Sequence, residues 1–227
     1  MLNNNRKRKA KFINADKYKD EFERSRCFLP ISVGQPYHEG EKFAATIRLV
    51  NDSNFKECVI VVCDTLQRHT MAIFEPEMDE ESLYQKALQN GDAWIERNKS
   101  TIETLTIPYQ IVRWNKWLFS PLYQQKRKII DEAYDTDAKF KQAFDDTVSQ
   151  FLDRIKKRRK AINLSIAFNK SLEYVKEECV VDVLWIKEQF SFIIYPRPRP
   201  IAKQIVFEKF IEENHEGFLG RLVVKFK

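Results

Sequence analysis

The stretch Cys58-Val59-Ile60-Val61-Val62-Cys63 decides the fold class of this chain. It is continuously apolar and mostly β-branched, which is typical of a strand buried on both faces of a parallel sheet. Asp64-Thr65 follows it, and this pair is a good helix N-cap. Further strands are expected at residues 27–32, 109–114 and 190–195.

Helical patterns separate these strands. They cover residues 39–50, 80–105 and most of 120–180, and a final helix precedes a short strand at 222–226. Strands that alternate with helices predict an α/β fold, namely a Rossmann-like, doubly wound, mostly parallel sheet with helices on both faces. The chain shows no linker and no internal repeat. We therefore expect a basic, flexible N-terminal segment at 1–20 and a single domain at 21–227.

The composition argues against several classes of protein. The 227 residues carry a net charge of +6, four cysteines and three histidines. The cysteines form no Cys-x-x-Cys pair, so we expect buried free thiols rather than disulfides or a zinc site. No apolar run is close to the roughly 20 residues that span a bilayer, and no apolar stretch follows the basic N-terminus. We expect a cytoplasmic monomer that uses no metal or cofactor and has no membrane contact.

Candidate catalytic side chains stand where strands end. Ser32 lies in Phe28-Leu29-Pro30-Ile31-Ser32-Val33-Gly34-Gln35, and Tyr195-Pro196 closes a later apolar run. Doubly wound sheets bind their ligands beyond the carboxyl ends of the strands. Tyr174 and Glu178 are four residues apart in a helical stretch, so both can point into one pocket. A hydroxyl nucleophile beside a tyrosine and a carboxylate that handle protons indicates acyl transfer.

In this order and spacing, these residues resemble the cyclodipeptide synthases, and in particular the subgroup whose late motif reads Tyr-Pro. The resemblance runs from about residue 27 to 196 and places the nucleophilic serine of the family at Ser32. The Tyr-x-x-x-Glu pair of the family falls on Tyr174 and Glu178, and its Tyr-Pro falls on Tyr195-Pro196. Gln35 stands where the other main subgroup has asparagine. The family is similar to the catalytic domains of tyrosyl- and tryptophanyl-tRNA synthetases of class I.

The resemblance implies an enzyme that uses two aminoacyl-tRNAs and releases a cyclic dipeptide (a diketopiperazine) by a ping-pong mechanism. Ser32 would carry first an aminoacyl group and then a dipeptidyl group, while Tyr195 relays protons. Glu178 would hold the α-ammonium group and accept a proton as the peptide bond forms. The substrate ester is already activated, which agrees with the lack of His-x-Gly-His and Lys-Met-Ser-Lys-Ser signatures for ATP.

Basic stretches are the candidate tRNA-binding surface. The region equivalent to the basic helix of the other subgroup, 77–103, is acidic to mixed here, so we expect phosphate contacts elsewhere. The expected residues are Lys126, Arg127, Lys128, Arg154, Lys156, Lys157, Arg158, Arg159 and Lys160. Apolar side chains at the strand ends suggest hydrophobic amino acids as substrates. The candidate substrate-binding residues are Gln35, Leu29, Ile31, Val61, Leu184 and Ile193.

Two other functions stay open. The chain could be a non-catalytic tRNA-binding module that kept a synthetase-like fold. A serine hydrolase is the weaker alternative, because Ser32 lacks a Gly-x-Ser-x-Gly context and no histidine is well placed in the sequence to partner it. Further polar residues near strand ends are favoured as structural rather than catalytic; these are Asp64, Arg68, His69 and Arg113.

Overall fold

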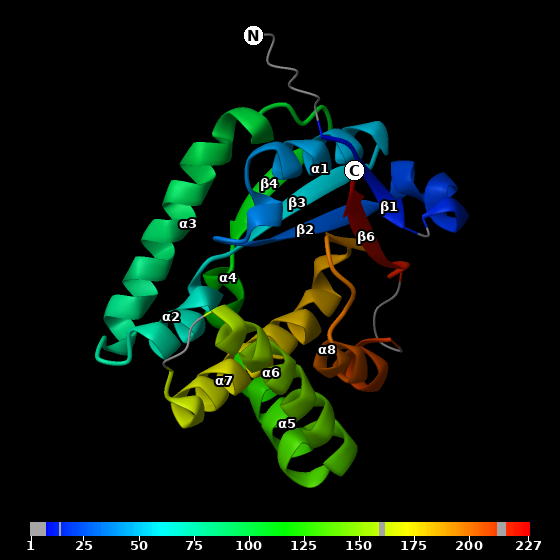
Figure 1. Ribbon diagram of the computed structural model, residues 1–227. Coiled ribbons are helices and arrows are strands. Elements are labelled where there is room, and N and C mark those ends of the chain that lie inside the picture. Colours follow the sequence, from blue (N-terminus) through cyan, green and yellow to red (C-terminus); the bar gives the residue numbers. More distant parts are fainter. Residues whose placement is uncertain (1–7, 14, 159–161, 213–216) are drawn as a thin grey trace.

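The fold is built on one mixed sheet, seen in the computed structural model, which describes residues 8–13, 15–158, 162–212 and 217–227 (Figure 1). The strand order is β1-β6-β5-β2-β3-β4. Neighbouring strands are parallel except β1 and β6, which are antiparallel. The strands are β1 (Ala10–Ile13), β2 (Arg26–Ser32), β3 (Glu57–Cys63), β4 (Tyr109–Arg113), β5 (Phe192–Tyr195) and β6 (Gly220–Phe226).

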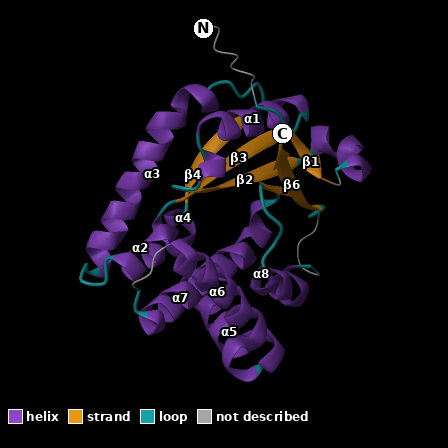
Figure 2. Cartoon of the chain, viewed as in Figure 1, coloured by secondary structure: helices purple, strands orange, loops and turns teal. Residues whose placement is uncertain are grey.

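Helices cover both faces of the sheet, which confirms the predicted α/β fold (Figure 2). One face packs on α1 (Gly40–Asp52) and α3 (Glu80–Ile102). The other face packs on a helical layer centred on α7 (Leu164–Leu184). This layer also contains α2 (Arg68–Phe74), α4 (Asn115–Leu118), α5 (Tyr123–Thr136), α6 (Ala138–Arg158) and α8 (Ile201–Val206). Short 3-10 segments lie at Asp16–Arg24, Pro36–His38, Thr65–Gln67 and Trp185–Glu188, and a π-helical turn at Phe207–Ile211 follows α8.

The first strand was not predicted. β1 lies inside the basic segment expected at 1–20, and it pairs with β6 from Ala10 opposite Phe226 to Ile13 opposite Val223. Its four residues carry no strong strand signal, and the pairing partner lies at the other end of the chain. The apolar side chain of Phe12 packs against the core under α1, so part of this segment belongs to the fold.

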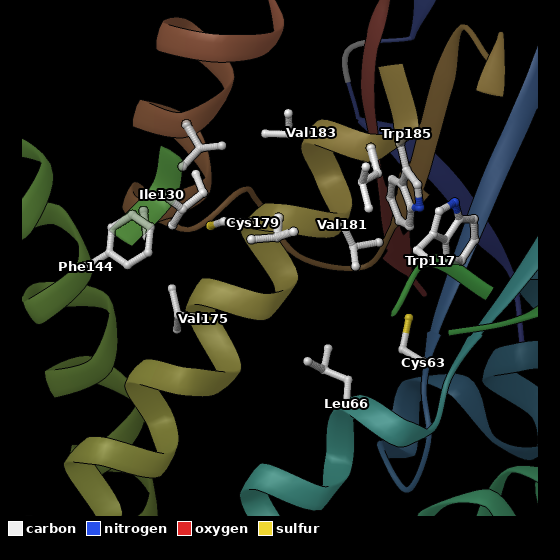
Figure 3. Packing of buried hydrophobic residues seen from close by; sticks show 14 of the residues in the cluster. Cys63, Leu66, Trp117, Ile130, Phe144, Val175, Cys179, Val181, Val183 and Trp185 are labelled. Atoms are coloured by element: carbon white, nitrogen blue, oxygen red, sulfur yellow. The ribbon is translucent and has the colours of Figure 1, made fainter. Parts of the chain in front are cut away.

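The core layer under α7 is the larger of the two hydrophobic clusters among the described residues (Figure 3). Val175, Cys179 and Val181 of α7 pack with Phe144 of α6 and with Trp185, and all five are at most 6% exposed. A helix buried around most of its circumference has to be covered by other elements. Within the described residues no helix is long and apolar enough to cross a membrane.

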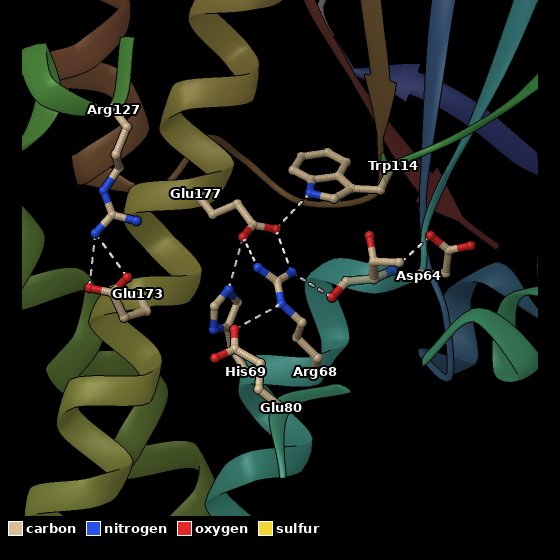
Figure 4. Close-up of polar contacts among 9 residues, drawn as sticks. Asp64, Arg68, His69, Glu80, Trp114, Arg127, Glu173 and Glu177 are labelled. Atoms are coloured by element: carbon tan, nitrogen blue, oxygen red, sulfur yellow. Dashed lines mark hydrogen bonds and ion pairs between the residues drawn. The ribbon is translucent and has the colours of Figure 1, made fainter. Parts of the chain in front are cut away.

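A buried carboxylate fixes α7 against its neighbours (Figure 4). Glu177 accepts two hydrogen bonds from the guanidinium of Arg68, one from His69 Nε2 at 3.0 Å and one from Trp114 Nε1 at 3.0 Å. Burial alone would raise the pKa of Glu177, but the hydrogen bonds from His69 and Arg68 lower it to about 2. We call these four residues the Glu177 clamp. The clamp indicates a structural role for Arg68 and His69. This is the interpretation that the sequence analysis favoured.

Asp64 and Arg113 form a second buried contact, at the ends of β3 and β4. Arg113 donates to Asp64 and Asp92, and Asp64 also accepts from the backbone N–H of Thr65 at 2.7 Å. Gly91 of α3 lies directly against this pair. A Cβ atom at residue 91 would stand 2.7 Å from Asp64 Cβ and 2.8 Å from Arg113 Nη2. This glycine is therefore required by close packing.

Gly91→Ala is expected to lower the free energy of unfolding by about 1–3 kcal/mol, because the added methyl group overlaps the Asp64–Arg113 pair. Alanine favours a helix over glycine by roughly 1 kcal/mol, so an exposed site would show the opposite sign. Gln89→Ala, at an exposed position of α3, is the matched control. Urea unfolding measures both variants. Equal or higher stability of Gly91→Ala would contradict the close packing.

Glu177 should make stability depend on pH. The folded protein keeps this carboxylate charged where the unfolded chain, with a pKa near 4.5, has bound a proton. The contribution of the clamp is therefore complete above about pH 4.5 and is lost as the pH falls towards 2, by about 3 kcal/mol in total. Glu177→Gln should be less stable at pH 7 and should lose less stability across this window. Parallel loss in both proteins would contradict the assignment.

Candidate active site

The candidate active site lies where the strand order reverses. From β2 the chain adds β3 and β4 on one side, and then returns to place β5 and β6 on the other side. β2 pairs with β3 as far as Ser32 and Cys63, but with β5 only at Cys27 and Phe28. The carboxyl ends of β2 and β5 therefore part. In open α/β sheets this is the crevice that receives ligands.

Ser32 and Tyr195 meet across this crevice. Ser32 Oγ lies 2.7 Å from the hydroxyl of Tyr195, which lies 3.1 Å from the hydroxyl of Tyr37. The sequence predicted that Ser32 and Tyr195 would lie close together, and it missed Tyr37. Burial, and then the neighbouring Tyr37, raise the pKa of Tyr195 well above its usual value. Tyr195 is thus a neutral phenol at physiological pH, able to accept one proton while it donates another.

The backbone of Ser32 has its own partner. Its N–H donates to His38 Nδ1 at 2.8 Å, and His38 is fully buried. Burial lowers the pKa of His38 to about 3, so the ring is neutral. A histidine therefore does lie beside Ser32, but it binds the backbone, while Tyr195 binds the hydroxyl. The sequence interpretation missed this contact, although His38 follows Gln35 by three residues in the same loop.

α7 brings the second predicted pair to the same region. Lys203 Nζ donates to Glu178 at 3.0 Å and to Asp182 at 2.9 Å. Burial raises the pKa of Tyr174 well above its usual value, and the carboxylate charge of Glu178 raises it further. Lys203 and Asp182 were not predicted. Asp182 could have been found, because it continues the Tyr174–Glu178 spacing by four residues.

The candidate substrate-binding residues divide between the two faces of the sheet. Leu29 and Ile31 are fully buried in the core beneath α1 and α3. Val61, Leu184 and Ile193 lie on the opposite face, with α7. Successive residues of a strand point to opposite faces, which separates the two groups. Gln35 acts through its backbone in the loop after Ser32: its N–H donates to Ser32 O at 3.2 Å, and its carbonyl accepts from His38 N at 2.8 Å.

The predicted tRNA-binding residues differ in their exposure and in whether they form ion pairs. Arg154, Lys156 and Lys157 are exposed near the end of α6. Arg127 instead pairs with Asp131 and Glu173, each at 2.8 Å. Lys126 is half-buried; Lys128 is exposed and lies 3.6 Å from Glu132. The side chain of Arg158, together with Arg159 and Lys160, lies outside the described residues.

A cavity of about 480 Å³ opens beside the loop that follows β2. Val33 and Gly34, which come directly after Ser32, form one wall. The described residues that complete the lining are Gln67, Thr70, Met71, Phe74, Glu75, Asn90 and Arg97. This lining mixes apolar and hydrogen-bonding side chains from α2 and α3. The cavity therefore lies beside the loop of Ser32, and its described lining does not include Ser32, Glu178 or Tyr195.

Comparison with known proteins assigns this arrangement to a family. The protein-family models and the curated proteins gave no match. A solved structure of a CDPS (cyclodipeptide synthase) from Fluoribacter dumoffii is 39% identical, with a TM-score of 0.92, and the match covers 97% of this chain and 98% of that chain.

Two more distant structures share the fold. A cyclodipeptide synthase from Candidatus Glomeribacter gigasporarum, bound to Phe-tRNAPhe, is 13% identical with a TM-score of 0.75, over 94% of this chain and 93% of that one. A Mycobacterium tuberculosis protein, reported to relate these enzymes to type I tRNA synthetases, is 12% identical with a TM-score of 0.68, over 96% and 93% of the two chains. Given 39% identity along nearly the full length of the Fluoribacter enzyme, this chain belongs to the cyclodipeptide synthases.

Proposed function

We propose that this protein joins two aminoacyl groups, each delivered as an ester on tRNA, into a cyclic dipeptide through acyl intermediates on Ser32. The observation that carries the proposal is the 2.7 Å contact between Ser32 Oγ and the Tyr195 hydroxyl at the strand-order reversal. A serine hydroxyl in contact with a neutral phenol can pass its proton on while it attacks an ester. The pair Tyr195-Pro196 favours the Tyr-Pro subgroup.

The first step forms the aminoacyl enzyme. Ser32 Oγ attacks the ester carbonyl, and the ribose hydroxyl of the tRNA leaves. The proton lost by Ser32 passes to Tyr195, which gives its own phenol proton to the departing ribose oxygen. Tyr195 ends the step as it began, which suits a group whose pKa lies well above neutrality.

The second step uses α7. Lys203 donates to Glu178 Oε1, and we propose that Oε2 accepts from the α-ammonium group of the bound residue. Once that amine has lost a proton to Glu178, it attacks the second aminoacyl ester. Glu178 passes this proton to the departing ribose oxygen and takes up the surplus proton of the attacking nitrogen, and the second tRNA leaves. The dipeptide on Ser32 then closes: its free amine attacks the ester carbonyl, the bond to Oγ breaks, and Ser32 regains its proton.

The tRNA is proposed to contact the exposed end of α6. Arg154, Lys156 and Lys157 have no strong carboxylate partner among the described contacts, unlike Arg127. Exposed cations without such partners can exchange counterions for phosphates. The cavity beside Val33 and Gly34 is a suitable place for the ribose end of the tRNA, which is the group that leaves in the first step.

Ser32→Ala should abolish both the intermediate and the product. With aminoacyl-tRNA labelled in the amino acid, wild-type protein should retain covalent label and Ser32→Ala should not. Diketopiperazines in the medium of expressing bacteria, measured by mass spectrometry, should fall by about a thousandfold or more. Ser171→Ala is the matched control, because Ser171 is a buried serine of α7 whose hydroxyl binds only the backbone carbonyl of Ala167 among the described contacts.

Two results would contradict the proposal. Label on Ser32→Ala would move the nucleophile to another residue. Absence of diketopiperazines from wild type, with tRNA still bound, would favour a non-catalytic tRNA-binding module.

Reversing the charges at Lys156 and Lys157 should weaken tRNA binding. We expect Lys156→Glu/Lys157→Glu to lower affinity about tenfold or more and to reduce the slope of log affinity against log salt by roughly 1–2. The control is Lys11→Glu/Lys225→Glu, two exposed lysines that are paired between β1 and β6. Filter binding at several salt concentrations measures both. Equal weakening in the two variants would show a general charge effect and would contradict the footprint on α6.

A further inference from the structure

His38 makes three kinds of contact around the nucleophile. Its Nδ1 accepts the N–H of Ser32 at 2.8 Å. Its ring packs edge-on against Tyr37 and Tyr195, with centroids 4.7 and 5.4 Å away. Its backbone carbonyl accepts from Trp94 Nε1 at 2.9 Å, which ties it to α3. One side chain therefore touches the backbone of Ser32 and both tyrosines of the hydroxyl chain.

The free-energy cost of burying the ring of His38 argues against a role in stability alone. Because Nδ1 accepts a hydrogen bond, the neutral ring carries its proton on Nε2. That Nε2 is buried and has no hydrogen-bond partner among the described residues. A buried polar group without a partner costs about 1–3 kcal/mol. A leucine or phenylalanine would fill similar space without that cost, but it would give up the acceptor for Ser32.

Hydrogen bonds at Ser32 and at His38 hold the two ends of the loop after β2. The N–H of Ser32 is bound by the ring of His38, and the carbonyl of Ser32 accepts from Gln35 N at 3.2 Å. The N–H of His38 returns to the carbonyl of Gln35 at 2.8 Å. Both backbone groups of Ser32 are thus held, and this fixes the direction of its side chain. The N–H of Ser32 is also unavailable as an oxyanion donor, so its function here is to position the residue.

We propose that His38 is the positioning residue of the nucleophile: its Nδ1 holds the backbone N–H of Ser32 and its ring supports Tyr195, so that Oγ and the phenol stay in hydrogen-bond contact. The inference rests on the proposed role of Ser32. His38 itself transfers no proton. A misplacement of about 1 Å at a reacting group can cost on the order of a hundredfold in rate, which sets the scale of the expected effect.

Three substitutions of His38 separate the effect of its hydrogen-bond acceptor on the acylation rate from the effect of its packing. In His38→Asn, Oδ1 can occupy the place of Nδ1 and restore an acceptor for the N–H of Ser32. In His38→Gln, the amide reaches the place of Nε2 instead. His38→Leu keeps an apolar volume without any acceptor. Single-turnover acylation of Ser32 by labelled aminoacyl-tRNA gives the rate of the step and its dependence on tRNA concentration.

We expect His38→Leu and His38→Gln to acylate about 10- to 100-fold more slowly, with half-saturating tRNA concentrations within about twofold of wild type. His38→Asn should recover most of the rate, although it leaves a smaller side chain in the core. Equal losses in all three variants would overturn the proposal in favour of packing alone. Wild-type rates in His38→Leu would also overturn it.

Amide hydrogen exchange at Ser32 provides a measurement that does not depend on catalysis. This amide should be protected in wild type and in His38→Asn, and should exchange faster in His38→Leu while amides of β3 stay protected. Protection in all variants would contradict the anchor. If wild-type protein takes no label at all, the proposed function fails, while the exchange result still decides the contact of His38. Thermal unfolding of each variant shows that it is folded.

Discussion

The orientation of α7 about its own axis is set by a single buried carboxylate. Glu177 is 1% exposed and is held by donors from Arg68, His69 and Trp114, which come from α2 and from the residue before α4. Neighbouring residues on a helix differ by about 100° around its axis. With Glu177 fixed towards α2, Glu178 points elsewhere and meets Lys203 of α8. The clamp thus directs the stripe of Tyr174, Glu178 and Asp182 towards the end of β5.

A buried ion pair adds little stability over apolar residues of the same volume, but breaking it by removing one partner is strongly destabilising. Any other rotation of α7 would leave the Glu177 carboxylate buried without its donors, and would leave Arg68 with only the Thr65 carbonyl and Glu80 as partners. The hydrophobic residues of α7 supply no such preference, because most of its circumference is apolar and buried. The apolar core therefore holds the helix in place, and the clamp selects its orientation. The candidate site depends on both, since Ser32 comes from a strand and Glu178 from this helix.

Most of the fold and the contact between Ser32 and Tyr195 could be predicted, because these signals are local or follow the family motif. The apolar run of β3 and the spacing of Tyr174 and Glu178 need only neighbouring residues. β1 was missed because its strand character depends on pairing with β6, far along the chain. Leu29 and Val61 were grouped in one pocket, although they face different layers, because strand alternation alone does not say which helices cover which face.

His38 and Lys203 were missed for a different reason. A single histidine in a loop and a single lysine after a proline-rich segment carry no periodic signal, and each is defined by what the fold brings against it. Gly91 shows the same limit. Within a helical pattern a glycine signals only weak helix propensity, whereas in the fold Gly91 makes room for Asp64 and Arg113 at the ends of neighbouring strands. The roles of all three residues depend on contacts between segments that are distant in the sequence.

The charges around Ser32 favour positioning over basicity. Burial raises the pKa of Tyr195 and lowers the pKa of His38 to about 3, so both stay neutral near pH 7. A hydrolase that acts on a stable amide needs a base tuned near the working pH to activate its serine. Under the proposed function, the ester on tRNA already carries the free energy for acyl transfer. A neutral relay suffices, and the rate then depends on how well the hydroxyl of Ser32 is aimed.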